Sequence, residues 1–395
     1  MRTKIRFTVT FILLCIVFTP FFSERNHTAH AAAQQKIGMF YLLWHCPASS
    51  SPRYRPSGTI YDNSKILAGE GDWGPVHAFH WWGKPAAGYY CLAENEDLLR
   101  QHAELLRDAG IDFVFVDATN QVNQEGSQRT IIAPFDKMIA AWSRVPGAPK
   151  IVPWVPITGK GDMVDYFDQK LTQYPQMAFT YRGKPLLLAM ARKSVPQSLQ
   201  YRKLLERYTI RTMWGLQKPA QLNAGEWSFL QPCGPDFKRR KGNVPCQQCM
   251  TYRNGSPEQI SVTSAYQIDY MSNTDPHSPS SAVPKFHGRT FLRQLETAYQ
   301  HPEVPIVTIT GWNEWIAQRM APRGGSDTLP NGNKIFVDAY NAEYNRDLEP
   351  GGGLGDYYYQ LMKRGIALLR SNRDPMLALS ETGKGKEKEK ENANE

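Results

Sequence analysis

The residues best suited to chemistry stand at the end of one apolar run. Residues 306–310 are mostly β-branched, as in a buried parallel strand, and Gly311-Trp312-Asn313-Glu314-Trp315 follows directly. A buried carboxylate without a partner costs several kcal/mol, so a strand that only fills the core is not expected to end in this way. A strand end that faces a ligand can use such a carboxylate to bind it. We therefore expect Glu314 to be a functional carboxylate.

Unusual side chains also fall at the ends of other expected strands. The set consists of Trp44, His45, Asp117, Asn120, Trp154, Trp214, Trp312, Asn313 and Trp315. A sugar site needs aromatic faces for stacking, with carboxylates and amides among them for the hydroxyl groups. The set therefore favours a sugar site. The alternative is that several of these tryptophans fill the core.

Each candidate also has a structural interpretation. Glu314 would pair with Arg319 or a backbone amide, and Asp117 would cap the loop after its strand. His45 would bond a hydroxyl group or anchor the loop that follows it. Asn313 would contact a sugar hydroxyl or orient Glu314. Weaker catalytic candidates are the spare carboxylates Asp269, Asp338 and Glu343.

Classical glycoside hydrolysis needs two carboxyl groups that flank the scissile bond, one of them able to protonate the leaving oxygen. We assign Glu314 and Asp117 as this pair. Nucleophilic serine or cysteine chemistry is less favoured, because the sequence has no Gly-x-Ser-x-Gly elbow and no cysteine with an obvious histidine partner.

The elements that would position these residues alternate between strands and helices. Expected strands cover 37–45, 112–117, 150–157, 186–190, 210–216, 226–231, 260–267 and 306–315. Expected helices cover 95–109, 135–144, 162–174, 196–208, 288–300 and 356–369. Eight strands alternating with helices predict an α/β protein, a single-domain (β/α)8 TIM barrel with long loops at the C-terminal ends of its strands. A doubly wound sheet is the alternative, but no glycine-rich phosphate loop follows the first strand.

The two ends of the chain differ in composition from its middle. Residues 1–31 have a charged start, an apolar run and an Ala-His-Ala cleavage site, which predicts a signal peptide. A retained anchor is the alternative. Residues 32–375 would form the barrel, and the Lys- and Glu-rich residues 376–395 a disordered tail. We expect a secreted or periplasmic protein without a later membrane span.

Charge and cysteines limit the partners. Removal of residues 1–31 lowers the formal charge from +9 to +6, and no nucleic-acid-binding module is present. We expect a monomer without a cofactor.

In an exported protein Cys46 and Cys91 predict a disulfide. Three further cysteines, Cys233, Cys246 and Cys249, would hold a loop by one disulfide, or bind zinc together with His277 or His287.

Three segments, 311–319, 336–350 and 353–359, resemble the corresponding motifs of bacterial glycoside hydrolase family 71/99-like proteins. The resemblance implies a secreted (β/α)8 barrel that acts on or binds α-linked polysaccharides such as α-mannan or α-1,3-glucan. Endo-acting members carry a second carboxylate three residues after the first. Glu314 matches the first of these positions, whereas Ala317 stands at the second.

Alanine cannot give a proton to a leaving group, so the departure at Ala317 leaves three hypotheses. The first is a hydrolase in which another group, such as Asp117, supplies the acid. The second is a barrel that binds glycans without cleaving them. The third is a lyase or metal-assisted enzyme for an acidic polysaccharide. Arg319 would favour an anionic sugar or a charge-paired Glu314.

Overall fold

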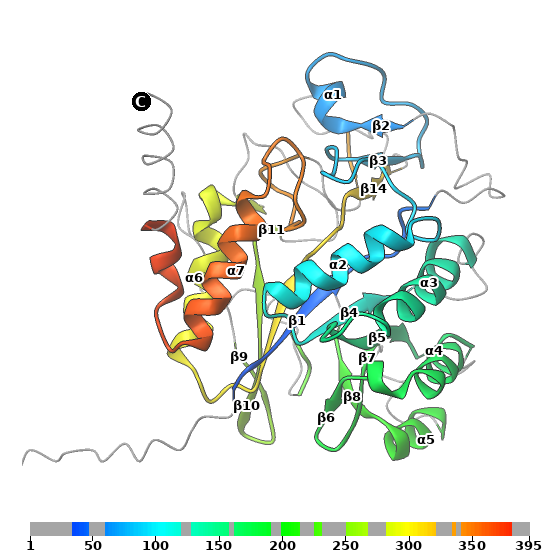
Figure 1. Cartoon of the computed structure of the whole chain (residues 1–395), viewed down its shortest axis with the longest axis vertical. Helices are drawn as coiled ribbons and strands as arrows, with labels where there is room; N and C mark the ends of the chain where they lie inside the picture. The colour runs from blue at the N-terminus through cyan, green and yellow to red at the C-terminus, as the bar shows by residue number, and fades with distance from the viewer. Residues whose placement is uncertain are drawn as a thin grey trace, which may run out of the picture. The chain divides into compact units, whose positions relative to one another are not determined.

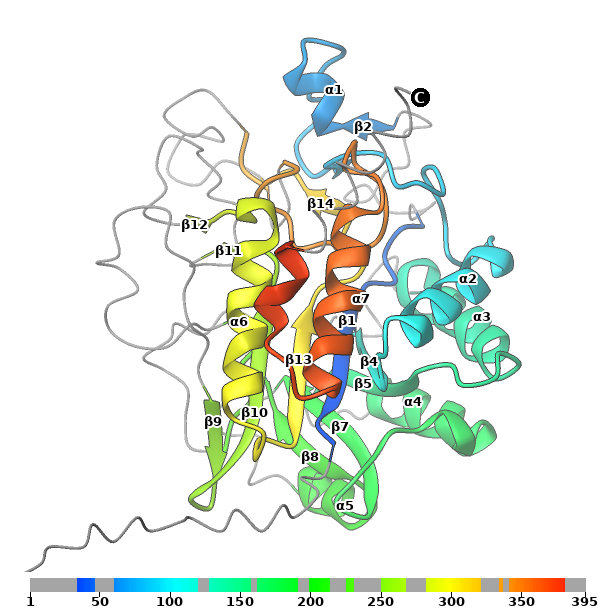
Figure 2. The same ribbon diagram turned by 60° about the vertical axis from the view of Figure 1, so that its left-hand side comes forward.

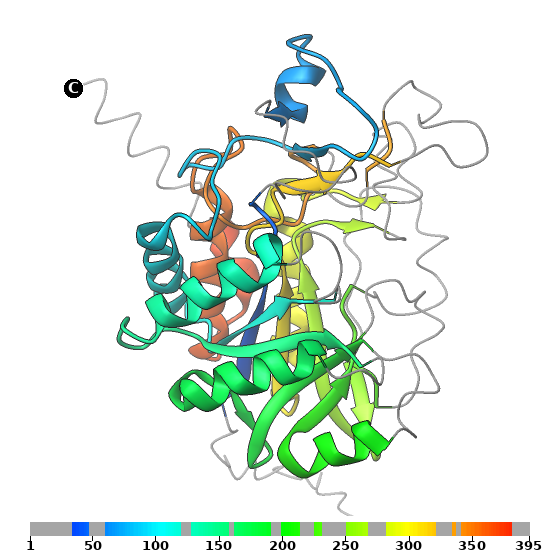
Figure 3. The ribbon, with the colours of Figure 1, turned by 90° about the vertical axis from the view of Figure 1, so that its right-hand side faces the viewer.

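The structure, a computed structural model, describes residues 34–46, 60–119, 128–157, 162–190, 199–213, 225–230, 250–267, 282–320, 334–336 and 341–380. At its centre is a nine-stranded sheet with the order β6-β7-β5-β4-β1-β13-β10-β9, in which β8 also pairs with β7 (Figure 1). The sheet is curled, and helices cover its outer face (Figure 3).

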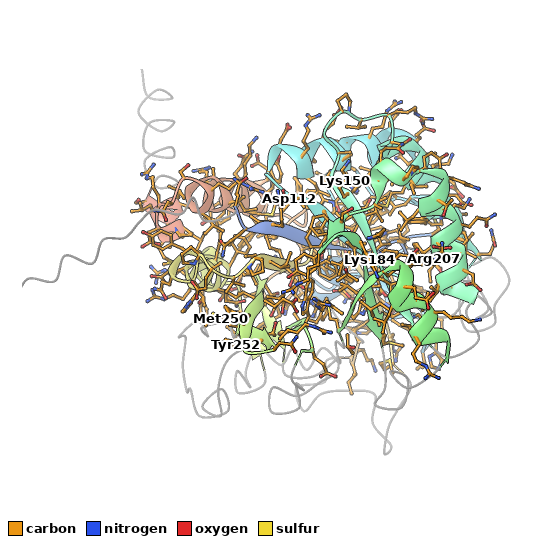
Figure 4. All side chains as sticks on the ribbon, turned by 90° about the horizontal axis from the view of Figure 1, so that it is seen from below. Asp112, Lys150, Lys184, Arg207, Met250 and Tyr252 are labelled. Atoms are coloured by element: carbon orange, nitrogen blue, oxygen red, sulfur yellow. A yellow bond between two sulfur atoms is a disulfide. The ribbon has the colours of Figure 1, made fainter. Side chains whose placement is uncertain are left out.

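Seven of these strands run parallel. They are β1 (Lys36–Tyr41), β4 (Phe113–Asp117), β5 (Lys150–Pro156), β7 (Lys184–Met190), β8 (Thr209–Thr212), β10 (Ser256–Thr263) and β13 (Ile306–Thr310). Their near-continuous burial matches their β-branched and aromatic composition. Two short antiparallel strands, β6 (Thr180–Tyr181) and β9 (Met250–Arg253), pair with the starts of β7 and β10. Neither is among the expected strands. Figure 4 views the end where the parallel strands start, with Lys150 and Lys184 labelled at β5 and β7.

The six predicted helices are confirmed, with bounds close to those expected. They are α2 (Glu96–Asp108), α3 (Ala133–Trp142), α4 (Asp162–Gln173), α5 (Leu199–Arg207), α6 (Arg289–Gln300) and α7 (Tyr357–Arg370). A π-helical turn, Gln128–Ile132, precedes α3, and 3-10 turns cover Pro175–Met177, Phe286–Gly288 and Pro375–Leu377. Helices α6 and α7 lie side by side on the sheet (Figure 2).

Helix α2 shows how the sequence sets such bounds. The Asn95 side chain accepts the amide hydrogen of Leu98, which caps the first turn. Leu98, Leu99 and Leu106 are buried on one face, as the helical period of apolar residues predicts. Gly110 follows the last turn with φ near +82°, a left-handed conformation that glycine adopts easily and that ends the helix.

The predicted sixth strand is wrong within the described residues 226–230. One parallel bridge joins Met213 to Trp227, and the amide of Trp227 donates to the carbonyl oxygen of Thr212. The amide and carbonyl of Ser228 instead bond the side-chain amide of Gln259, at 3.0 and 2.9 Å. A side chain of β10 thus takes the place of a neighbouring strand, so backbone pairing does not close the described sheet into a ring of eight.

The predicted strand over 306–315 is also too long. Strand β13 ends at Thr310, the peptide bond Thr310–Gly311 is cis, and β14 (Ile316–Gln318) belongs to another sheet. That sheet, here called the cap sheet, pairs β14 with β3 (Phe79–Trp81) and β3 with β2 (Tyr61–Asp62). It lies with α1 (Asn63–Leu67) beyond the C-terminal end of the main sheet (Figure 1). The expected loop rim is therefore partly a small sheet.

Four further predictions concern one strand, the C-terminal residues, a disulfide and membrane spans. Strands β11 (Tyr266–Gln267) and β12 (Ala282–Val283) form a separate pair, so the expected strand 260–267 is interrupted after Thr263. Met376, Ala378 and Leu379 pack on the core, and Ala378 is fully buried. The predicted Cys46–Cys91 disulfide is confirmed. None of the described helices is long and apolar enough to span a membrane.

Several predictions concern residues outside the described ranges. These are the signal peptide, the tail beyond Ser380, Asn120, Trp214, Asp269, Asp338, His277 and the three cysteines Cys233, Cys246 and Cys249.

Candidate active site

Glu314 lies in a buried turn, residues 311–315, that follows β13 and is here called the Glu314 turn. The end of β1 holds one side of it. The amide of Trp312 donates to the carbonyl oxygen of Phe40 at 2.9 Å. The side chain of Asn313 bonds both backbone groups of Leu42, at 2.8 and 3.0 Å. Nε2 of His45 donates to the carbonyl oxygen of Asn313 at 2.7 Å. Two neighbouring strand ends are thus joined.

The segment Arg346-Asp347-Leu348-Glu349, here called the 346–349 segment, holds the other side. The amide of Gly311 donates to the carbonyl oxygen of Arg346 at 3.1 Å. The amides of Leu348 and Glu349 both donate to the carbonyl oxygen of Trp312, at 3.2 and 3.0 Å. This segment therefore runs alongside the Glu314 turn as an irregular backbone partner.

Glu314 itself is fixed at two points by this segment. Its backbone amide donates to the carboxylate of Asp347, and its carboxylate accepts a hydrogen bond from Nη2 of Arg346. Both charged side chains are buried, and their ion pair keeps Glu314 from being a buried charge without a partner. Nη1 of Arg319 donates to the carbonyl oxygen of Gly74. The interpretation of Glu314 as an ion-paired carboxylate is thus realised, with Arg346 as the partner.

Three of the predicted sugar-stacking tryptophans are buried by the protein itself. Trp312 packs edge-on against His102 and Tyr359, and it is fully buried. Trp315 is also fully buried, and its indole donates to Glu349. Neither ring presents a face to a ligand, so the interpretation of core filler holds for both.

Trp154 belongs to an aromatic cluster within the curl of the sheet. Its ring lies 4.9 Å from that of Phe229 and 6.2 Å from that of Phe40. Its indole N–H donates to the carbonyl oxygen of Met213 at 3.2 Å. The ring is 4% exposed, so its aromatic faces are used for packing. Trp44, in contrast, is only partly buried at the end of β1.

Asn313 and His45 are likewise structural in their contacts. Asn313 is fully buried and uses its amide group on Leu42, so it orients the Glu314 turn and does not face a sugar. Burial lowers the pKa of His45 to about 3, so the ring is neutral at neutral pH. Because a carbonyl oxygen only accepts, Nε2 of His45 carries the hydrogen.

Asp117 ends β4 and caps the loop that follows. Its Oδ1 accepts the amide hydrogen of Thr119 at 2.9 Å and the hydroxyl hydrogen of Thr119 at 2.8 Å. This is the loop-capping contact that we considered for it. Side chains alternate along a strand, so Asp117 shares the face of Phe115, whose ring packs in the aromatic cluster. It therefore stands one layer beyond that cluster, at the C-terminal edge.

Ala317 is buried at the position where the resemblance places a second carboxylate. It pairs with His80 across β14 and β3 and packs with Phe336 and Trp73. Burial lowers the pKa of His80 to about 4, and both of its ring nitrogens lie near carbonyl oxygens. The cap sheet thus fills this position with apolar and neutral groups.

Four charged residues of this site were not predicted from the sequence: Lys285, Arg346, Asp347 and Glu349. The amine of Lys285 donates to Asn345 Oδ1 at 2.9 Å and to the carbonyl oxygen of Asp347 at 3.2 Å. Burial lowers the pKa of Lys285 to about 8 and raises the pKa of Asp347 to about 7. Three of the four lie in the run Asn-Arg-Asp-Leu-Glu-Pro, 345–350, whose dense charges are the signal that could have identified them.

Glu349 connects the Glu314 turn to helix α2 and β1. One of its oxygens accepts from the Tyr90 hydroxyl at 2.8 Å and from the Trp315 indole. The other accepts from Nε2 of His102 at 2.9 Å, and Nδ1 of His102 in turn accepts from the Tyr41 hydroxyl at 2.7 Å. Every donor in this buried network thus has an acceptor, as a buried polar network requires.

Taken together, the Glu314 turn is a rigid support for one carboxylate. Hydrogen bonds from β1 and from the 346–349 segment fix its backbone, and a guanidinium orients its carboxylate. A carboxylate in this setting can act as a general base, a nucleophile or an electrostatic stabiliser, because hydrogen bonds fix its position before a ligand arrives.

No protein-family model and no curated protein matches this chain. Its structure is similar to that of a glycoside hydrolase-like protein, with 13% identity over 84% of this chain and 93% of that chain, at a TM-score of 0.45. It is also similar to two structures of GH99 endo-alpha-mannosidase from Bacteroides thetaiotaomicron, one in complex with BIS-TRIS-propane. They share 14% identity over 85% of this chain and 97% and 98% of theirs, at TM-scores of 0.46 and 0.45. Structures of the family that the sequence motifs resemble are therefore among those similar to this chain.

Proposed function

We propose that the protein is a glycoside hydrolase for an α-linked polysaccharide, with Glu314 as its key carboxylate. The observation that carries this proposal is the support built around Glu314 at the C-terminal end of β13. The Glu314 side chain keeps 9% of its surface exposed, whereas those of Arg346 and Glu349 keep 3% and 4%. Of these three charged groups, Glu314 is the one that a ligand reaches most easily.

Asp117 is the proposed second carboxyl group. Strands β4 and β13 both pair with β1, one on each side, so Asp117 and Glu314 follow strands that are two apart. Neighbouring strands lie about 4.8 Å apart, which puts these two strands roughly 10 Å apart. Paired carboxyl groups of glycosidases act at separations of about 5 to 10 Å. In this pair one group protonates the leaving oxygen, and the other attacks the sugar or activates water.

The proposal includes a complete (β/α)8 barrel with an irregular sixth strand. The eight segments follow one another in chain order around the curl, and residues 225–230 come between β8 and β10. The bridge of Trp227 to Met213 on one side and the bonds of Ser228 to Gln259 on the other support this position. A barrel would gather Glu314 and Asp117 at one face.

The substrate class rests on the sequence motifs. Segments 311–319, 336–350 and 353–359 resemble those of family 71/99-like proteins, which implies an α-linked polysaccharide. Sugar stacking is assigned to Trp44 at the end of β1 and to Trp214, and hydroxyl binding to Asn120. The predicted signal peptide at 1–31 and the Cys46–Cys91 disulfide support export, and we propose that the exported protein is a monomer.

Replacement of Glu314 by Gln tests the proposal. It keeps the shape of the side chain and removes the charge, so release of oligosaccharides from α-mannan or α-1,3-glucan should fall by at least about 100-fold. Asp117→Asn should have an effect of similar size. The matched control is Glu303→Gln, which changes an exposed carboxylate just before β13, at the opposite end of that strand, and should leave turnover unchanged. Full turnover in Glu314→Gln would remove Glu314 from the mechanism.

A different outcome would support the binding hypothesis. Purified protein that binds these polysaccharides but releases no oligosaccharide would be a non-catalytic glycan-binding barrel, as the replacement at Ala317 allows. Activity lost on chelation and restored by a divalent ion would instead support metal-assisted chemistry.

A further inference from the structure

The Cys46–Cys91 disulfide joins the end of β1 to the chain just before α2. The two cysteines are 45 positions apart in sequence, and the span between them contains β2, α1 and β3. Cys46 is buried and Cys91 is partly exposed. The amide of Ala93 also donates to Sγ of Cys46 at 3.3 Å. The bond thus fixes where the cap-sheet chain leaves and rejoins the main sheet.

The residue before each cysteine is linked to the Glu314 turn. Before Cys46, His45 donates to the carbonyl oxygen of Asn313. Before Cys91, Tyr90 donates to Glu349 at an oxygen that also accepts from the Trp315 indole. Asn313 and Trp315 are the two chain neighbours of Glu314. Both are therefore held by contacts that begin beside the disulfide.

His45 and Tyr90 also hold each other. Their ring centroids lie 4.7 Å apart, and Trp81 packs against them at 5.6 and 5.5 Å. A disulfide brings the backbones of its two cysteines close, here to a Cα–Cα distance of 4.3 Å. It therefore keeps the preceding residues, His45 and Tyr90, within contact distance.

We propose that the Cys46–Cys91 disulfide is a positioning element of the site, which orients Glu314 through His45 and Tyr90. This inference rests on the proposed function of Glu314. The contacts of the turn with Leu42 and with the 346–349 segment do not pass through the disulfide, so the turn stays folded without it. What is lost is the orientation of Glu314, which affects kcat more than KM.

The decisive variant is Cys46→Ala/Cys91→Ala, which leaves Cys233, Cys246 and Cys249 intact. We expect kcat to fall at least about tenfold with KM changed by less than about threefold. Amide hydrogen exchange in residues 311–316 should accelerate at least about tenfold, while β10 and α6 keep their protection. Treatment of the wild type with a dithiol should have the same effect. Two electrons and two protons then pass to the cysteines, giving two thiols and the cyclic disulfide of the reagent.

A matched pair of tyrosines tests the route through Tyr90. Tyr90→Phe removes only the hydroxyl that bonds Glu349, and it should reproduce part of the loss in kcat. Tyr89→Phe removes a hydroxyl that bonds Asp62, away from the Glu314 turn, and it should leave kcat unchanged. This pair also decides the question if the double cysteine variant fails to fold.

The outcomes separate this inference from the proposed function. If the wild type releases no sugar, the proposed hydrolase activity fails, and the exchange rates of residues 311–316 alone decide whether the disulfide positions the turn. Unchanged kcat and unchanged exchange in the double variant would overturn the inference. A uniform loss of protection across β10, α6 and the turn would also overturn it, because the disulfide would then only stabilise the fold.

Discussion

The indole rings of Trp82 and Trp315 stack with their centroids 4.4 Å apart and their planes 13° from parallel. Trp82 donates its indole hydrogen to Asp347 at 2.6 Å, and Trp315 donates its own to Glu349. Asp347 also accepts the amide hydrogen of Glu314. The stack therefore connects the chain after β3 to the carboxylate that the proposed function depends on.

We expect Trp82→Phe and Trp315→Phe each to lower the free energy of unfolding by about 2 to 4 kcal/mol. Each replacement keeps an aromatic ring but leaves a buried carboxylate without one donor, and bonds to charged groups contribute about 1.5 to 3 kcal/mol. Loss of part of the stacking contributes about 0.5 to 1.5 kcal/mol more. Urea unfolding at pH 8, above the pKa of about 7 that burial gives Asp347, measures these changes.

The control for these two variants is Trp142→Phe. Trp142 is fully buried as well, but its indole donates to a neutral carbonyl oxygen, that of Leu99, at 2.8 Å. We expect a smaller loss of about 1 kcal/mol for the hydrogen bond. Equal losses of unfolding free energy for all three variants would contradict the view that hydrogen bonds to the two carboxylates cause the larger losses at Trp82 and Trp315.

Arg346→Met should destabilise the protein by about 3 to 5 kcal/mol, because it breaks the buried ion pair of Arg346 with the carboxylate of Glu314. Adding Glu314→Gln should recover at least about 1 kcal/mol of this loss, since the charge that Arg346 neutralised is then removed as well. The coupling is measured by a double-mutant cycle of unfolding free energies. Strictly additive effects would show that the two side chains do not stabilise each other.

Local patterns were sufficient to predict most of the scaffold. The helical period of Leu98, Leu99 and Leu106 and the stop at Gly110 fixed α2, and apolar runs fixed the parallel strands. The disulfide was predictable as well, because Cys46 and Cys91 lie in one long connection and the signal-peptide pattern of residues 1–31 predicts export. The placement of Glu314 at a strand end followed from its position directly after the β-branched run of β13.

The partners of Glu314 were not predictable from such patterns. Arg346 and Asp347 lie more than 30 residues away and reach the Glu314 turn through side-chain bonds that have no period. Burial of Trp312 and Trp315 was only the alternative interpretation for a related reason: the turn directs their rings at α2, α7 and Trp82, whereas an extended strand would not. The prediction of a sixth strand was wrong because the side chain of Gln259 bonds the backbone of Ser228, where a neighbouring strand would otherwise pair.

Glu258→Gln should lower stability without changing turnover per folded molecule. Arg211 donates twice to the carboxylate of Glu258, at 2.8 and 2.6 Å, and both side chains are buried. Glu258 also accepts from Tyr181, in the chain just before β7, so the pair lies toward the end where the strands start. Breaking it should cost about 3 to 5 kcal/mol. Urea unfolding and kcat, measured together, check this; a fall in kcat with full folding would contradict it.

The pH dependence of stability provides the last prediction, through Asp347. Burial raises its pKa in the folded protein to about 7, from an ordinary value of 3.8. Between pH 4 and 7 the folded state therefore binds a proton that the unfolded state has released. Raising the pH through this window removes stability, by at most about 1.4 kcal/mol per pH unit.

Asp347→Asn cannot titrate, so the wild type should lose stability relative to this variant as the pH rises from about 4 to about 7. Urea unfolding of both proteins at each pH measures the difference and cancels the titration of other groups. Lys285→Met is a control variant whose effect on stability is expected in a higher pH range. Burial lowers the pKa of Lys285 to about 8, so in the wild type its contribution to stability rises above that pH, up to its ordinary value of 10.5. A wild-type advantage over Asp347→Asn that stays constant or grows between pH 4 and 7 would show that Asp347 is ionised in the folded protein throughout, held so by Trp82, Lys285 and the amide of Glu314.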